Sequence, residues 1–123
     1  MKKNLLFVGG IFQVLIILLH IGMFFGIASA AELAAYAKQS LIIFNASVLT
    51  AAAFATYVSL FHRSELIGTG IGRVICWFIA IFYLQRGLVE LFIRGFDITS
   101  LIMTGVMTGI YMAVVIPTRA RAV

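Results

Sequence analysis

The segment Val74–Ile93 reads VICWFIAIFYLQRGLVELFI, an apolar run that contains two charged residues, Arg86 and Glu90. Its length matches the roughly 20 residues that an α-helix needs to cross about 30 Å of hydrocarbon. A charge inside hydrocarbon costs about 2.5 kcal/mol or more, so such residues usually face a protein interior and serve a function. The i, i+4 spacing puts both side chains on one face of a helix. This segment therefore predicts a membrane span and a candidate site together.

The rest of the chain has the same apolar character. Of its 123 residues, 63% are hydrophobic and 11% are charged, whereas a soluble domain carries roughly 25% charged residues. Three further apolar segments have the length of a span: Leu5–Ile27, Leu41–Phe61 and Ile98–Ile116. Short connections make neighbouring helices antiparallel. We therefore expect residues 1–123 to form one all-α domain, an integral membrane protein built as an antiparallel four-helix bundle.

The basic residues predict how the spans are oriented, because Lys and Arg concentrate in cytoplasmic loops. One predicted side of the membrane carries six of them: Lys2, Lys3, Arg63, Arg73, Arg119 and Arg121. The other side carries only Lys38 and Arg94, next to Glu32 and Asp97. Both termini are therefore expected in the cytoplasm. The net charge of +5 then indicates contact with anionic membrane lipids, and nucleic acid is not an expected partner.

The first apolar segment has a second interpretation. Met1–Ala31 has two lysines, an apolar core and a run of small residues, Ala28–Ala31, as a secretory signal does. The apolar core of a signal is 7–15 residues long, however, and this one is longer and contains Gln13 and His20. We therefore expect the segment to stay in the protein as the first span; its cleavage would leave three spans.

Polar side chains from all four spans are predicted to lie at one depth, in the outer third of the membrane. The depth follows from the rise of 1.5 Å per helical residue, and Tyr83 shares a helix face with the charged pair. The set consists of His20, Asn45, Tyr83, Arg86, Glu90 and Thr104. Because a lipid-facing polar group is costly, these side chains are expected to turn inward and meet.

Three functions are compatible with this polar layer. The favoured one is a non-enzymatic structural or accessory role, with Arg86 and Glu90 as an internal clasp, because polar groups often just join membrane helices at about 0.6 kcal/mol each. The first alternative is a small-molecule or anion binding or transport protein, since the planar fork of Arg86 suits a carboxylate or phosphate. The second is a lipid- or quinone-directed enzyme with His20 or Glu90 as general base.

Neither a catalytic residue nor a metal or cofactor is assigned. His20 and His62 fall at opposite ends of the predicted bundle, so they cannot share a metal ion, which needs three or four ligands. Cys76 is the single cysteine and is expected to be a buried, inert thiol. The histidines and the thiol therefore give no sign of redox or metal chemistry.

The glycines predict a turn and two sites of close packing. Gly68–Gly72 (GTGIG) lacks the Lys-Ser/Thr of a phosphate-binding loop and is expected to be a flexible turn. The pairs Gly22/Gly26 and Gly105/Gly109 have the small-x3-small spacing that lets helices approach closely. Such a pattern also occurs where copies of a chain associate, so the sequence is compatible with a homo-oligomer or a larger membrane complex.

Two stretches carry a family resemblance. Glu65–Arg73 (ELIGTGIGR) and Ile79–Arg86 (IAIFYLQR), together with His20 and Asn45, resemble a group of small four-helix bacterial membrane proteins of unassigned function. The resemblance implies a multi-pass protein of the bacterial cytoplasmic membrane and brings no substrate. Small multidrug exporters are similar in length but place a glutamate in the first span, where this chain has Gln13 and His20. The signatures of fluoride channels are not found.

The predicted orientation can be tested with reporter fusions. A reporter that is active only in the periplasm is expected to be silent when fused after Val123 and active when inserted next to Glu32. Activity of the fusion at Val123 would contradict the prediction that the C-terminus is cytoplasmic.

Overall fold

A computed structural model describes residues 1–117, and this part of the chain is helical apart from short turns. Its elements are α1 (Lys2–Ser29), α2 (Ala35–Phe61), α3 (Arg63–Gly68), α4 (Gly70–Arg94) and α5 (Ile98–Val115). In the described residues, α1, α2, α4 and α5 are each long and apolar enough to cross a membrane. The predicted all-helical fold and its spanning segments are confirmed to that extent. The largest difference in bounds is at α2, which begins at Ala35 instead of Leu41.

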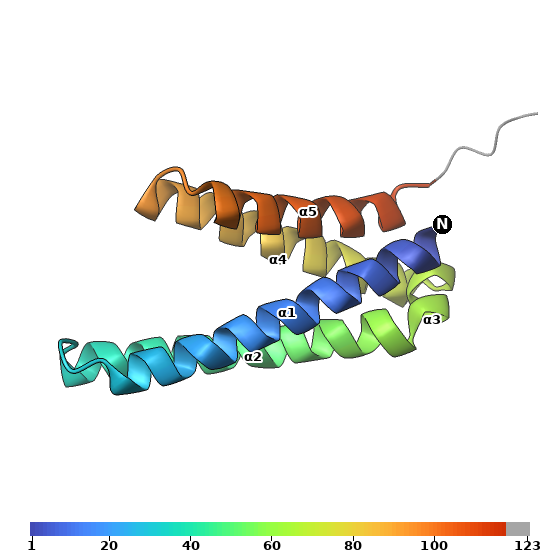
Figure 1. Cartoon of the computed structure of the whole chain (residues 1–123). Coiled ribbons are helices and arrows are strands. Elements are labelled where there is room, and N and C mark those ends of the chain that lie inside the picture. Colours follow the sequence, from blue (N-terminus) through green and yellow to red (C-terminus); the bar gives the residue numbers. More distant parts are fainter. Residues whose placement is uncertain (118–123) are drawn as a thin grey trace, which may run out of the picture.

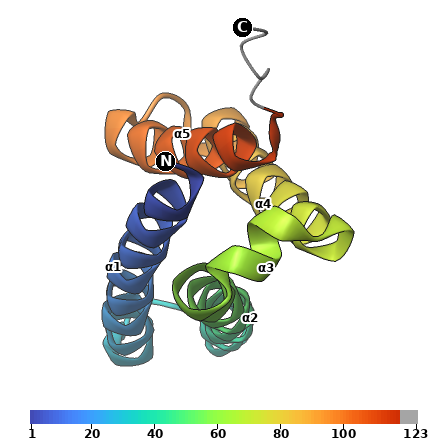
Figure 2. The same cartoon turned by 90° about the vertical axis from the view of Figure 1, so that its right-hand side faces the viewer.

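The long helices pair into two hairpins. Helices α1 and α2 pack along much of their length, as do α4 and α5, and α1 also packs on α5. Figure 1 shows that the hairpins meet at the end that holds the N-terminus and α3, here called the junction end, and diverge towards the other, here called the open end. Viewed along the helices, α3 lies between α2 and α4, which do not pack as a pair (Figure 2).

The short helix α3 replaces part of the predicted flexible turn. Only Thr69 separates α3 from α4, and its side-chain oxygen accepts a hydrogen bond from Gly72 N at 2.9 Å. This is the contact of a helix N-cap, which satisfies a free N–H of the first turn. Gly70–Gly72 are therefore helical, and the prediction of a flexible turn at Gly68–Gly72 is wrong. The glycines serve close packing here: a Cβ on Gly72 would collide with the Glu65 carbonyl oxygen and lie 2.5 Å from Leu66 Cα.

The start of the chain is fastened to the last helix at the junction end. Lys2 Nζ donates hydrogen bonds to the carbonyl oxygens of Val114, at 2.8 Å, and Ile116, at 2.9 Å. The last carbonyls of a helix have no partners within it, so the ammonium group caps α5 from another hairpin. Helix α5 ends at Val115, two residues before Pro117, which cannot continue a helix. The predicted cytoplasmic residues Arg119 and Arg121 lie outside the described residues.

The most buried apolar side chains lie where the hairpins meet. Fully or almost fully buried are Leu6, Leu66, Cys76, Met107 and Tyr111. By contrast, nothing lies within 4 Å of a Cβ built on Gly22, Gly26, Gly105 or Gly109. The prediction that these glycines allow close helix packing is therefore wrong within the described chain. The close approach between hairpins lies instead at the junction end, where a Cβ on Gly9 of α1 would lie 3.2 Å from Ile110 Cγ2 of α5.

The contact between α3 and Gly72 predicts a local sensitivity. Gly72→Ala is expected to lower the free energy of unfolding by about 1–3 kcal/mol, the usual cost of forcing an extra carbon into a packed site. Gly70→Ala is the matched control, because a Cβ there meets nothing within 4 Å. Unfolding of both variants in mixed micelles measures the difference, and equal stability of the two would contradict the packing described here.

Candidate functional site

A cleft of about 220 Å³ lies between the two hairpins, towards the open end. All four long helices contribute to its walls. Its apolar lining includes Ile16, Leu19, Met23, Val48, Ala52, Phe82 and Met103. Its polar lining consists of His20, Tyr83, Arg86, Glu90, Arg94, Asp97, Thr99, Ser100 and Thr104. The cleft thus combines charged and polar side chains with apolar walls, which suits a ligand that has a charged group and an apolar part.

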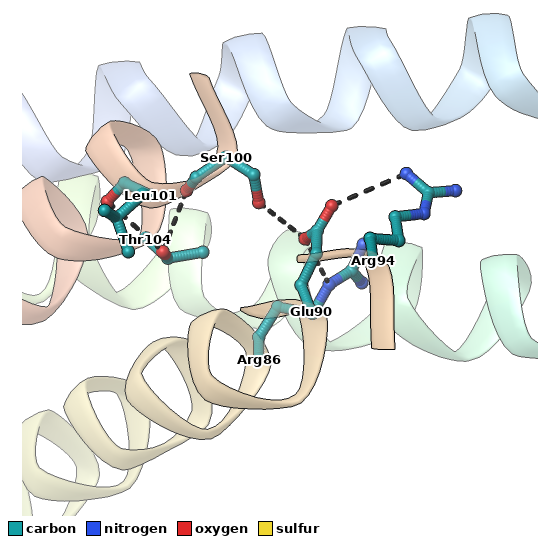
Figure 3. A network of polar contacts seen from close by, with 6 residues as sticks. All are labelled: Arg86, Glu90, Arg94, Ser100, Leu101 and Thr104. Carbon is teal, nitrogen blue, oxygen red and sulfur yellow. Dashed lines mark hydrogen bonds and ion pairs between the residues drawn. The ribbon is translucent and has the colours of Figure 1, made fainter. Parts of the chain in front are cut away.

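The Glu90 carboxylate is the centre of the charged region (Figure 3). Arg86 Nε lies 3.7 Å from Glu90 Oε2, and Arg94 Nη1 lies 3.5 Å from Glu90 Oε1. The Ser100 hydroxyl donates a hydrogen bond of 2.5 Å to Glu90 Oε2. The Glu90 side chain is 15% exposed, whereas that of Arg86 is 42% exposed. One carboxylate therefore faces two guanidinium groups, neither of which it holds with a short hydrogen bond.

Local helix geometry assembles this charged region within the α4–α5 hairpin. Arg86 and Arg94 are each four residues from Glu90, so all three share a face of α4. Gly95 then ends α4 at a φ of 80°, a conformation that glycine adopts without strain. Asp97 Oδ1 accepts a hydrogen bond from Thr99 N at 3.1 Å and so caps the start of α5. This tight turn brings Ser100 back to Glu90.

The α1–α2 hairpin forms the opposite wall. His20 is 8% exposed and lines the cleft. Its Nδ1 lies 2.8 Å from the carbonyl oxygen of Ile16. Because a carbonyl oxygen only accepts, Nδ1 is the donor there. Asn45 Nδ2 donates to the His20 carbonyl oxygen at 2.9 Å, so this residue joins α2 to α1.

The six predicted site residues are thus only partly brought together. His20, Tyr83, Arg86, Glu90 and Thr104 line the cleft, but Asn45 does not. Thr104 Oγ1 donates back to the Ser100 carbonyl oxygen at 2.8 Å, within its own helix. In residues 1–117, no hydrogen bond or ion pair of these six side chains crosses from one hairpin to the other. Across the cleft, His20 of one hairpin faces the other four lining residues without a polar contact to them.

Besides the Lys2 cap, a buried contact between polar side chains joins the hairpins, and this contact was not predicted. The Tyr111 hydroxyl on α5 accepts a hydrogen bond from Gln13 Nε2 on α1 and lies 2.5 Å from Ser59 Oγ on α2. All three side chains are fully buried. Tyr111 lies seven residues after Thr104, on the same face of its helix. That spacing was the available signal, but a tyrosine in an apolar span is ordinarily counted as apolar.

The lining residues offer no preformed metal site. Within residues 1–117, no group of three or more His, Cys, Asp or Glu side chains is placed to hold a metal ion. The formal charges of the cleft balance, with Arg86 and Arg94 against Glu90 and Asp97. A ligand would therefore meet separate positive and negative groups, and a single negative charge suits the exposed guanidinium of Arg86.

Comparison of the chain with protein-family models, with curated proteins and with solved structures finds no match. This result is consistent with the resemblance to a family of unassigned function.

The contact of Tyr111 with Gln13 and Ser59 predicts that this hydroxyl stabilises the junction. Tyr111→Phe is expected to lower the free energy of unfolding by about 1–2 kcal/mol, because two buried polar groups lose a partner. Tyr36→Phe, at a side chain that is 82% exposed, is the matched control. Both are measured by unfolding in mixed micelles, and a loss no larger than that of the control would exclude a stabilising role.

Proposed function

We propose that this protein binds a small ligand with one anionic group in the cleft, without converting it chemically, and that Arg86 anchors that group. The observation that carries the proposal is the sharing of Glu90 by Arg86 and Arg94, at 3.7 and 3.5 Å. Glu90 also accepts the Ser100 hydrogen bond. Arg86 has no other polar contact in the described chain, so its guanidinium fork can take a carboxylate or phosphate.

The structural alternative has weaker support. A clasp between helices must join parts of the chain that would otherwise separate, but Arg86, Glu90, Arg94 and Ser100 all belong to the α4–α5 hairpin. The Arg86–Glu90 pair lies within α4 alone. The catalytic alternative gains nothing from the cleft either, because His20 Nδ1 and Glu90 already have partners in the chain.

The proposal includes a placement in the membrane. We propose a bacterial cytoplasmic-membrane protein whose four spans run antiparallel, with both termini in the cytoplasm. Basic residues at the start of α1, α3 and α4 support this orientation, because Lys and Arg favour the cytoplasmic side. The junction end would then be cytoplasmic, and the cleft would open in the outer half of the membrane.

The test is binding of a soluble phosphodiester, glycerophosphoethanolamine, measured by calorimetry on the purified protein. Arg86→Lys is expected to weaken this binding by about tenfold to a hundredfold, because a lysine cannot replace the two-pronged contact of the guanidinium. Its unfolding midpoint is expected to stay close to that of the unmodified protein.

Arg73→Lys is the matched control, since Arg73 lies on the same helix at the junction end and outside the cleft. It is expected to leave binding unchanged. Equal binding by both variants would overturn the proposal. A large loss of stability in Arg86→Lys, without any effect on binding, would favour the structural role instead.

A further inference from the structure

A narrow apolar seam lies next to the cleft, between α2 and α4. It has a volume of about 40 Å³ and lies between Ala51 and Ala55 on one side and Phe78 and Ile79 on the other. The seam exists because the small side chains of α2 face large ones of α4, while the two helices do not pack as a pair. Phe54 and Phe78, which border it, are 53% and 64% exposed, so the seam opens on the outer surface of the helices.

The seam adjoins the cleft. Ala52, Phe82 and Tyr83 line both. Along α4, the seam residue Phe78 precedes Arg86 by eight residues, which is about 12 Å of helix towards the junction end. In the proposed orientation this direction runs from the outer half of the membrane to its middle. It is also the direction in which an acyl chain extends from its headgroup in the outer leaflet.

The dimensions of the seam restrict what can occupy it. An α-helix with its side chains is about 10–12 Å across, too wide for a volume of about 40 Å³. A single acyl chain is narrow, flexible and apolar, and a seam of this volume can enclose a short stretch of it while the rest of the chain lies in the surrounding bilayer. The charged region next to it has the complementary chemistry for a headgroup, because a phosphodiester carries one negative charge for Arg86 and the nearby acids Glu90 and Asp97 can face an ammonium group.

We infer that the ligand is a phospholipid, with its phosphodiester at Arg86 in the cleft and an acyl chain in the α2–α4 seam, entering sideways from the bilayer. This inference rests on the proposed function and adds the class of ligand. It makes the seam a second determinant of binding, separate from the charged region. Blocking the seam should therefore affect the intact lipid and spare the free headgroup.

The experiment compares three probes on the full-length protein in detergent: phosphatidylethanolamine, its deacylated form glycerophosphoethanolamine, and diacylglycerol. Native mass spectrometry and calorimetry give the dissociation constants. The intact phospholipid is expected to bind at least about a hundredfold more tightly than the deacylated form, because buried methylene groups add affinity. It is expected to bind at least about tenfold more tightly than diacylglycerol, which lacks the phosphate.

The seam is tested with Ala51→Leu, which adds three carbon atoms at a half-buried position of its lining. This variant is expected to weaken phospholipid binding by about tenfold and to leave binding of the deacylated form unchanged. Ala53→Leu, at an exposed position of the same helix outside the seam, is the matched control. Unchanged binding of the deacylated form also shows that Ala51→Leu is folded; if it is not, Ala51→Val repeats the test.

The outcomes separate the two proposals. If the deacylated form binds as tightly as the phospholipid, and both depend on Arg86, the anion site stands and the inference of a lipid is overturned. Equal effects of Ala51→Leu and Ala53→Leu would overturn it as well. If diacylglycerol binds as tightly as the phospholipid and Arg86→Lys changes nothing, the anion site itself is excluded.

Discussion

The hydrogen bonds of the Tyr111 hydroxyl hold the molecule in its shape. Within a bilayer, an apolar helix gains little by leaving lipid for another apolar helix, so close packing and polar contacts decide which helices associate. Gln13, Ser59 and Tyr111 bring α1, α2 and α5 together at one buried point. This point lies towards the junction end, where Lys2 also caps α5. The hairpins are fastened there and diverge beyond it.

The divergence gives the charged residues their setting. Had the hairpins closed along their whole length, Arg86 and Glu90 would be surrounded by apolar side chains, at the high cost of a buried ion pair. In the cleft, Arg86 keeps 42% of its side chain exposed, and Glu90 has a hydrogen bond and two cationic neighbours. The proposed binding of a phospholipid would use the same opening, since the seam between α2 and α4 adjoins it.

Several parts of the site could be predicted and others could not. The pairing of Arg86 with Glu90 follows from their spacing on one helix, which is local geometry. Ser100 as the third partner of Glu90 depends on a tight turn at Gly95–Asp97, whose conformation no periodicity reveals. Asn45 has the depth of the cleft residues but contacts the backbone of α1 instead, because a rotation of its helix by a fraction of a turn decides which side chain faces the cleft.

The sequence by itself determined that the chain is helical, where its four long apolar segments lie, and which side chains are too polar for lipid. These properties depend on residue type and on spacing within one helix. Tertiary structure decided the rest: that α3 is a helix, that Tyr111 joins the hairpins, and that the cleft opens between them. The reason is physical, since contacts between helices depend on rotation and tilt, which residues distant in the sequence fix together.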